Sequence, residues 1–315
     1  MDQTKLLHEI EMTEIEGLRI GNAQDQEAGT GVTVLIFDHG AKVGVDVSGG
    51  GPASRETHLC SPMTADNPVN AIVLSGGSAY GLAASGGVMR YLEEHGIGYE
   101  TGFAKVPLVC QSCIYDLGYG RPDVRPDEAM GYAACVDAEK NQPSSGNIGA
   151  GTGATVGKLY GMGRSMKAGL GIHAVTVGNL QMAAVVVVNA LGDIYDPETG
   201  QIIAGLRTED GTGFADTCQE IYKLSQRRDM FTGNTTIGAI ITNGRFSKAE
   251  MNKIASMTRN AYARCINPVG TLADGDTIYA ASVGQVEADI NMAGTLAAEV
   301  MAGAIIKAVY AAQQD

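Results

Sequence analysis

Apolar residues along this chain fall into short runs of strand length, separated by glycine-rich turns and by segments with a helical period. Two such runs in residues 30–50 flank Asp38-His39-Gly40, which is typical of a hairpin turn. Residues 70–96 predict a buried strand, a glycine turn and a helix. Residues 172–196 predict two more strands around a Gly-Asn turn. By contrast, residues 106–125 and 138–159 are rich in turn-forming residues and are predicted to be loops.

The last third of the chain has the most regular pattern. Ser247 and Glu250 form a capping box that marks the start of one of its helices. The predicted elements are a helix over 216–230, a strand over 236–242, a helix over 247–265, a strand over 276–283 and a helix over 286–312. Strands that come in pairs, with helices between the pairs, favour an α+β fold in which stacked sheets are covered by helices. We expect a single domain over residues 1–315.

Composition and charge narrow the functional classes. The chain is 44% hydrophobic and 18% charged, which is ample for a packed core. Its formal net charge of −13 argues against a nucleic-acid partner, which would require a basic face. The longest apolar run, MAAVVVVNALG, is far shorter than the ~20 residues of a membrane span. Residues 1–17 mix charges and lack the apolar core of a secretory signal, so we expect a cytoplasmic protein with reduced thiols and no membrane partner.

The glycine-rich segment GAGTGATVGKL, residues 149–159, resembles a phosphate-binding loop. Such a loop requires a glycine where this chain has Thr152, and a serine or threonine where it has Leu159. Both differences affect positions that contact phosphate or magnesium, so the sequence disfavours an NTPase. We expect instead that the turn delivers Lys158 to a crowded place.

A second glycine-rich segment, SGGSAYGL, lacks the G-x-S-x-G spacing of a nucleophile elbow. The backbone amides of Gly76, Gly77 and Ser78 precede a predicted helix and are candidates for substrate binding. No His/Asp set is fixed by the sequence to serve a catalytic triad, and His58 and His173 are expected to be structural.

Polar residues at the ends of strands are further candidates. Asn189 directly follows an apolar run, where its amide is either a turn former or a donor to a developing oxyanion. Asp274 and Asp276 flank a glycine, and the alternative to a functional pair is an ordinary solvated Asp-Gly turn. Without further ligands this pair does not predict a metal site.

Cys110 and Cys113 have the C-x-x-C spacing of a redox or metal-binding pair. A single pair of this kind is a weak zinc signal, and we expect buried structural thiols. The spacing also raises the hypothesis that oxidation of this pair alters activity.

The segment GNTTIGAIITN places two threonines where a turn enters a buried strand. The structural alternative is a turn followed by a strand. A threonine hydroxyl is a weak nucleophile that requires a base. If the bond between Asn234 and Thr235 is cut, the freed α-amine of Thr235 can act as that base, and the preceding Gly233 tolerates the strained turn that self-cleavage requires.

Taken together, six blocks resemble the DmpA-type P1 peptidase family, the L-aminopeptidase/D-esterase and β-aminopeptidase group of peptidase family S58, including its nylon-oligomer hydrolase branch. The resemblance covers nearly the whole chain. The blocks are residues 44–57, 73–98, 146–159, 166–171, 187–197 and 233–243. The resemblance implies a four-layer αββα sandwich, self-cleavage into chains 1–234 and 235–315, and a homo-oligomer of four or more subunits.

Carried over by position, the resemblance also implies functional residues. Thr235 matches the nucleophile released by the cut after Asn234, and Asn189 matches an asparagine that stabilises the oxyanion. Lys158 matches a lysine near the nucleophile in the nylon-oligomer branch. Asp274 and Asp276 match a polar pair that positions the nucleophile, where other branches carry Ser and Glu, and Tyr115 matches a tyrosine that assists the oxyanion.

The resemblance implies a hydrolase without cofactor or metal that acts on small peptides, amino-acid amides or esters. The acidic pair Asp274 and Asp276 favours substrates with a free, protonated amine. The alternatives are an acyltransferase of the glutamate N-acetyltransferase type, which would share the fold, and a non-catalytic nucleotide-binding protein.

Overall fold

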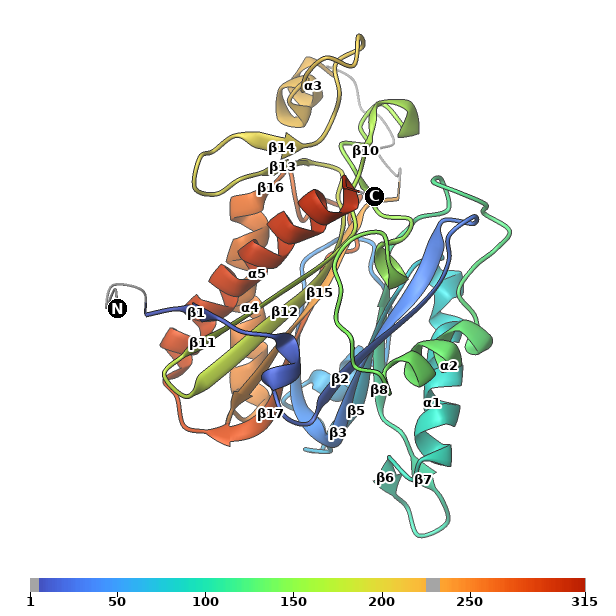
Figure 1. Cartoon of the computed structure of the whole chain (residues 1–315), viewed down its shortest axis with the longest axis vertical. Helices are drawn as coiled ribbons and strands as arrows, with labels where there is room; N and C mark the ends of the chain where they lie inside the picture. The colour runs from blue at the N-terminus through green and yellow to red at the C-terminus, as the bar shows by residue number, and fades with distance from the viewer. Residues whose placement is uncertain (1–5, 225–232, 315) are drawn as a thin grey trace.

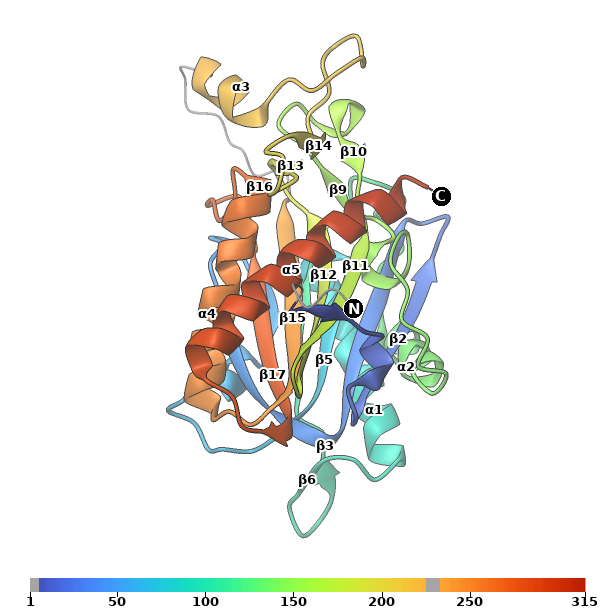
Figure 2. The ribbon, with the colours of Figure 1, turned by 60° about the vertical axis from the view of Figure 1, so that its left-hand side comes forward.

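Two β-sheets lie face to face between two layers of helices in the computed structural model, which describes residues 6–224 and 233–314 (Figure 1). The first sheet is built on β11 (Leu170–Val177), β12 (Leu180–Asn189), β15 (Thr235–Gly244) and β17 (Thr277–Val286). Helices α4 (Lys248–Cys265) and α5 (Ile290–Ala312) cover its outer face (Figure 2). The second sheet contains β2 (Leu18–Asp25), β3 (Thr30–Val47), β4 (Ala53–Arg55), β5 (Val69–Ser75) and β8 (Val109–Cys113). Helices α1 (Ala84–Glu94) and α2 (Glu128–Asp137) cover its outer face. This arrangement is the αββα sandwich.

Strand β3 belongs to both sheets, and the predicted hairpin over residues 30–50 is wrong. Residues 30–37 of β3 pair with β2 and β5, whereas residues 42–47 pair with β17. The register shifts between Ile36 and Ala41, where Gly40 has a φ of +72°. The Asp-His-Gly sequence therefore bends one long strand from one sheet into the other and does not reverse the chain.

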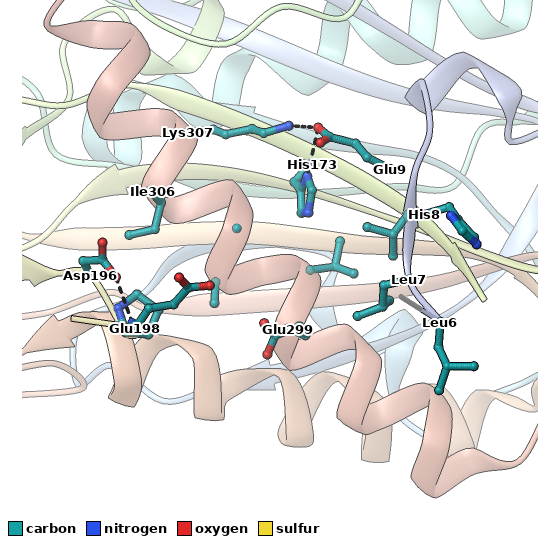
Figure 3. A pocket seen from close by; sticks show the side chains of 15 residues that line it. Leu6, Leu7, His8, Glu9, His173, Asp196, Glu198, Glu299, Ile306 and Lys307 are labelled. Carbon is teal, nitrogen blue, oxygen red and sulfur yellow. Dashed lines mark hydrogen bonds and ion pairs between the residues drawn. The ribbon is translucent and has the colours of Figure 1, made fainter. Parts of the chain in front are cut away.

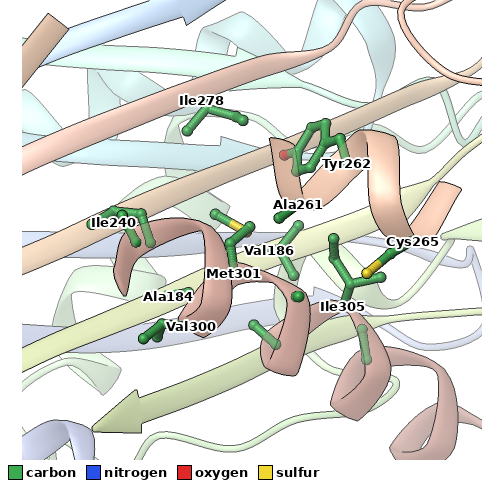
Figure 4. Packing of buried hydrophobic residues seen from close by; sticks show 14 of the residues in the cluster. Ala184, Val186, Ile240, Ala261, Tyr262, Cys265, Ile278, Val300, Met301 and Ile305 are labelled. Atoms are coloured by element: carbon green, nitrogen blue, oxygen red, sulfur yellow. The ribbon is translucent and has the colours of Figure 1, made fainter. Parts of the chain in front are cut away.

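Three apolar clusters fill the three spaces between the four layers. The outer cluster on one side joins alternate residues of β12, β15 and β17 to α4 and α5, including Val186, Ile240, Tyr262 and Met301 (Figure 4). The central cluster lies between the sheets and takes the intervening residues of the same strands. The third lies between the second sheet and helices α1 and α2. Because both faces of β12 and β15 are buried, the central parts of these strands, residues 182–188 and 237–241, are continuous runs without polar side chains.

Most predicted elements are present. One predicted loop contains a strand, and one predicted helix is described only in part. The predicted strands at 236–242 and 276–283 and the helices at 247–265 and 286–312 are confirmed by β15, β17, α4 and α5. The segment predicted as a loop at 106–125 contains β8, which pairs with both β5 and β4 and is buried. Of the helix predicted at 216–230, α3 covers Thr217–Lys223, and residues 225–230 lie outside the described residues.

The remaining strands are short. They are β1 (His8–Glu9), β6 (Tyr99–Glu100), β7 (Lys105–Val106), β9 (Thr155–Val156), β10 (Met166–Lys167), β13 (Asp193–Tyr195), β14 (Ile202–Ala204) and β16 (Ile266–Asn267). β1 pairs with β11 at the edge of the first sheet, and the others lie toward the ends of the sandwich (Figure 1). Among the described residues, α5 is the one helix long and apolar enough to cross a membrane by length and composition. Its most apolar window is 67% buried inside the protein against β11, β12 and α4, which accounts for that composition.

Candidate active site

The ends of three neighbouring strands bring the predicted catalytic residues together. Asn189, the last residue of β12, pairs with Thr235, the first residue of antiparallel β15. Residues directly opposite one another in an antiparallel pair have side chains on the same face of the sheet. Strand β17 runs parallel to β15, so the turn that contains Asp274 and Asp276 lies at the same edge, where Asn234 forms a bridge to Asp274.

The position of each threonine on β15 separates Thr235 from Thr236. Ile237, Ala239 and Ile241 face the space between the sheets, and Ile240 faces the helices. Because strand side chains alternate, Thr235 faces the space between the sheets and Thr236 faces the helix layer. Asn189 has the same orientation as Val185 and Val187, which lie between the sheets. Thr235 is therefore the threonine whose hydroxyl shares a face with Asn189.

A strained turn presents the Asn234–Thr235 bond. Gly233 has a φ of +71°, and a Cβ on it would lie 1.9 Å from a ring carbon of Tyr115, so only glycine fits. The Thr235 hydroxyl contacts the carbonyl oxygen of Asn234, the residue that precedes it. The backbone amide of Gly275 donates to the same carbonyl oxygen at 3.1 Å. The hydroxyl, the carbonyl and a hydrogen-bond donor are thus assembled around one peptide bond.

Lys158 and Asn189 form a buried pair beside this bond. The ammonium of Lys158 donates to the backbone oxygen of Asn189 at 2.9 Å, to its side-chain Oδ1 at 2.8 Å and to the Gly233 carbonyl at 3.1 Å. Asn189 Oδ1 also accepts from the Thr155 amide at 3.1 Å, and its Nδ2 donates to the Tyr115 carbonyl at 3.0 Å. The orientation of the Asn189 amide is therefore fixed. The glycine-rich turn before Lys158 delivers it to this crowded place, since a Cβ on Gly157 would lie 2.1 Å from the backbone of Gly205.

Of the two aspartates after the last turn, Asp276 holds the start of β15 and Asp274 holds the turn itself. Asp276 Oδ1 accepts from the Thr236 amide at 2.6 Å, and its Oδ2 accepts from the Gly270 amide at 3.0 Å. Asp274 Oδ2 accepts from the amide and hydroxyl of Thr271 at 2.8 and 2.6 Å. Both are buried, at 2% and 1% exposure, so this is not a solvated turn. Gly275 between them leaves room for the Thr235 side chain, because a Cβ there would lie 2.9 Å from the Thr235 hydroxyl.

Burial shifts the pKa values of these groups toward their neutral forms. Desolvation lowers the pKa of Lys158 to about 7, against the opposing effects of Asp274, Asp116 and Asp276. Desolvation, followed by repulsion from Asp274, raises the pKa of Asp276 to about 7. Desolvation also raises the pKa of Asp274. The site therefore contains an amine and a carboxyl that can both exchange protons near neutral pH.

The titration of Asp276 predicts a signed effect of pH on stability. Between its usual pKa of 3.8 and about 7, the folded chain keeps a proton that the unfolded chain has lost. The unfolding free energy therefore falls as pH rises through this range. In a Thr235→Ala background, which keeps one covalent form, we expect Asp276→Asn to remove part of this fall, on the order of 1.4 kcal/mol for each unit of pKa difference. Urea unfolding of both proteins at several pH values between about 4 and 7 measures the two slopes, and equal slopes would contradict the assignment.

A cavity of about 240 Å³ lies beside Lys158 and Gly233, the residue that precedes Asn234. It is lined by Tyr115, Asp116, Gly118, Tyr119, Thr155, Lys158, Gly161, Met162 and Gly233. The sequence analysis did not select Asp116, Thr155 or Gly275. Asp116 directly follows Tyr115, and a buried acid at the end of a strand was the available signal, which was missed because β8 was predicted to be a loop.

The backbone amides of Gly76, Gly77 and Ser78 are engaged by the protein itself. They donate to the Gly31 carbonyl, the Asp116 carboxylate and the Ile114 carbonyl, respectively, at 2.9, 2.7 and 2.9 Å. None of the three residues is among those that line the cavity. Direct substrate binding by these amides stays a prediction, whereas the contact of the Gly77 amide with Asp116 is a feature of the structure.

Cys110 and Cys113 do not form a pair. They lie three residues apart on β8, so their side chains point to opposite faces of the sheet. Cys110 Sγ lies 3.7 Å from Cys60 Sγ, and Cys113 Sγ lies 3.0 Å from the Ser75 hydroxyl. Burial raises the pKa of Cys113 to about 12. The hypothesis of an oxidation-sensitive C-x-x-C pair is therefore wrong. Among the described residues no group of three or more His, Cys, Asp or Glu side chains is arranged to hold a metal ion.

A larger cavity, of about 1030 Å³, lies away from this site between β1, β11 and α5 (Figure 3). There His173 and Lys307 both point toward Glu9, with His173 Nδ1 3.5 Å from a Glu9 oxygen. Neither Thr235 nor Lys158 lines this cavity. Of the predicted site residues, Lys158 and Tyr115 line the small cavity, and none lines the large one.

Comparison with known proteins identifies the family of the chain. The model of peptidase family S58 matches residues 11–314. An uncharacterized aminopeptidase of Mycobacterium leprae is 34% identical, with 96% of this chain and 90% of that protein covered. A 6-aminohexanoate-oligomer endohydrolase of a Kocuria species is 32% identical, with 93% of this chain and 84% of that protein covered.

Solved structures show the same fold at lower identity. The L-aminopeptidase D-Ala-esterase/amidase of Ochrobactrum anthropi, described as a variant of the Ntn hydrolase fold, superposes with a TM-score of 0.72 at 16% identity, over 96% of this chain and 86% of that one. A β-aminopeptidase of a Burkholderia species gives a TM-score of 0.67 at 17% identity, over 94% and 85% of the two chains. The chain therefore belongs to peptidase family S58 and is a hydrolase of the aminopeptidase type.

Proposed function

We propose that this chain cleaves itself between Asn234 and Thr235 and then hydrolyses small amides with Thr235 as an N-terminal nucleophile. The observation that carries this proposal is the arrangement at one peptide bond. The Thr235 hydroxyl contacts the Asn234 carbonyl, and the Gly275 amide donates to that carbonyl oxygen. Attack on the carbonyl carbon places negative charge on its oxygen, where such a donor stabilises it.

Self-cleavage would proceed in two steps. The Thr235 oxygen attacks the Asn234 carbonyl carbon, and the carbon–nitrogen bond breaks to leave an ester and a free amine on Thr235. The proton lost by the hydroxyl is returned to the departing nitrogen, and Lys158, with a pKa near 7, is suited to carry it. Water then hydrolyses the ester, which gives a carboxylate on Asn234 and a free hydroxyl on Thr235. The products are chains 1–234 and 235–315.

Turnover would repeat this chemistry on a substrate amide. The free α-amine of Thr235 takes the hydroxyl proton as the oxygen attacks, and passes it to the leaving amine. Lys158 and the fixed amide of Asn189 both donate to the Gly233 carbonyl in the uncut chain, the first at 3.1 Å and the second at 3.5 Å. If the end of the first chain, with the Gly233 carbonyl, moves away after the cut, Lys158 and Asn189 can donate to a substrate instead. Water resolves the acyl ester and completes the cycle.

The names of the relatives guide the choice of substrate. They include proteins named as aminopeptidases and proteins named as 6-aminohexanoate-oligomer endohydrolases, and both names denote hydrolysis of an amide bond. We propose small peptides, amino-acid amides and esters as substrates, with assembly of the cleaved protein into a homo-oligomer in the cytoplasm.

The test combines a mass spectrum with an assay. Freshly purified protein is denatured, weighed and assayed with amino-acid p-nitroanilides. We expect two fragments that correspond to residues 1–234 and 235–315, together with release of p-nitroaniline. An intact 32.7 kDa chain that hydrolyses these compounds would refute self-cleavage, and a cleaved but inactive protein would refute the substrate class.

A further inference from the structure

The segment of residues 48–51, here called the glycine strap, lies against the turn that contains Asp274 and Asp276. All four of its backbone amides donate to carbonyl oxygens of that turn at 2.8–3.2 Å, namely Ser48 and Gly49 to Asp276, Gly50 to Thr271 and Gly51 to Asp274. In the proposed cut the strap belongs to the first chain and the turn belongs to the second. These hydrogen bonds therefore connect the two products as well as two parts of the uncut chain.

One of these hydrogen bonds leads directly to the bond that is to be cut. The carbonyl of Asp274 and the N–H of Gly275 belong to one planar peptide unit and point in opposite directions. The Gly51 amide donates to that carbonyl at 2.8 Å, and the Gly275 amide donates to the Asn234 carbonyl at 3.1 Å. The strap thus fixes the plane that aims the Gly275 donor at Asn234. A hydrogen bond to the oxygen of a peptide unit also polarises its N–H, which makes that N–H a stronger donor.

The strap meets the turn so closely that one of its positions requires glycine. A Cβ on Gly49 would lie 2.4 Å from the Asp274 carbonyl oxygen and 2.3 Å from the Asp276 nitrogen, the atoms on either side of Gly275. A Cβ on Gly51 would lie 3.9 Å from the same carbonyl oxygen, which is an ordinary contact. Neither Gly49 nor Gly51 has a left-handed φ, so contact with the turn, and not backbone conformation, sets the requirement at position 49.

We propose that the glycine strap positions the Gly275 amide as the oxyanion donor for self-cleavage, and that Gly49 and Gly51 are positioning residues of that reaction. The inference rests on the proposed function, because it concerns the first step of the same self-cleavage. As the Thr235 oxygen attacks, negative charge builds on the Asn234 oxygen, and a donor displaced from that oxygen no longer stabilises it. The strap acts through the peptide unit of residues 274–275 and takes no part in the bond changes.

The test adds the same methyl group at three neighbouring positions, in Gly49→Ala, Gly50→Ala and Gly51→Ala. A Cβ on Gly50 would lie 2.7 Å from the Cα of Leu272, farther along the turn from Gly275. Each chain is made by cell-free synthesis, and the fraction cut is followed by mass over time. Ile36→Val, in the third apolar cluster, is the control for stability alone. The Tm of each variant is measured on uncut chains that also carry Thr235→Ala.

We expect Gly49→Ala to slow self-cleavage about 100-fold, which is the usual cost of losing one oxyanion donor. Gly50→Ala should slow it less, and Gly51→Ala, which keeps its amide and has room for the methyl group, should change it less than about threefold. Ile36→Val should lower Tm without slowing cleavage. Equal rates in all three glycine variants, or rates that simply follow Tm across the four, would overturn the proposal. If Gly49→Ala does not fold, the comparison of Gly50→Ala with Gly51→Ala decides in the same way.

Hydroxylamine identifies the step that the strap serves. It opens the ester formed by Thr235, leaves a hydroxamate on Asn234 and frees the hydroxyl, so that hydrolysis by water is bypassed. A donor that acts during the attack should leave the ratio of wild-type to Gly49→Ala rates about the same with and without hydroxylamine. If hydroxylamine brings the variant to the wild-type rate, the strap serves the water step and the proposal is wrong. A wild type that stays whole refutes self-cleavage and this inference together, whereas a cut wild type with equal variants refutes the role of the strap alone.

Discussion

Thr235→Ala is expected to remain one uncut chain of 315 residues without hydrolase activity. The substitution removes the oxygen that contacts the Asn234 carbonyl, and the bond that must break to release the amine of residue 235 then stays intact. Both the nucleophile and its base are lost together, so we expect amide hydrolysis to fall by at least about 10³-fold. The mass of the denatured protein and the rate of p-nitroanilide release measure the two effects.

Two further substitutions make this result specific. Thr236→Ala removes the neighbouring hydroxyl, which faces the helix layer, and it leaves the bond from the Thr236 amide to Asp276 in place. The Thr236→Ala variant should therefore cleave itself and hydrolyse substrates at the wild-type rates. Thr235→Ser keeps the oxygen and should also cut. A Thr235→Ala chain that still separates after residue 234, or a Thr236→Ala chain that does not, would exclude Thr235 as the nucleophile.

Local pattern was enough to predict most strands and helices, but not which strands are neighbours. β12, β15 and β17 are separated in sequence by long segments, and their pairing depends on burial of apolar side chains on both faces. The sequence pointed to Asn189 and Thr235 separately. Their placement opposite each other, which gives both side chains the same face, is a property of the antiparallel register.

The choice between Thr235 and Thr236 has the same origin. Both threonines suit the chemistry. The family resemblance pointed to Thr235, and the orientation of β15 between two cores supplies a physical difference between the two side chains. The hairpin predicted at Asp-His-Gly in β3 was wrong for a related reason. A bend between two sheets and a chain reversal within one sheet use the same turn-forming residues. Asp116 was missed because the short strand before it has no alternation, being buried on both sides.

The glycine-rich segments were recognised by composition, but their purpose depends on what approaches them. In a phosphate-binding loop, glycines bring backbone amides to a ligand. Here they admit a carboxylate, a hydroxyl or a neighbouring backbone, as Gly76 does for Asp116 and Gly275 does for Thr235. A sequence can show that side chains are absent from a position, whereas the structure shows which group occupies the space.

Lys158→Met is expected to block self-cleavage with little loss of folded structure. Methionine is unbranched like lysine, one atom shorter and without donors, so the Gly233 carbonyl and the oxygens of Asn189 lose the hydrogen bonds that Lys158 supplies. The variant also loses the one amine of the site whose pKa lies near 7 in the uncut chain. We expect cleavage to slow by about 10²- to 10⁴-fold, the usual contribution of a positioned proton carrier.

Lys167→Met is the matched control, because Lys167 also donates from a partly buried position to backbone carbonyls, including those of Gly151 and Ala154 at 3.0 Å. Lys167→Met should lower Tm and leave the rate of cleavage nearly unchanged. Lys158→Met should slow cleavage and leave Tm nearly unchanged. Burying a lysine charge costs free energy that methionine does not, which offsets the lost hydrogen bonds at position 158. The fraction of cut chain after timed incubation of freshly made protein, together with Tm, separates the two roles. If both variants cut at the wild-type rate, Lys158 holds the turn in place and carries no proton.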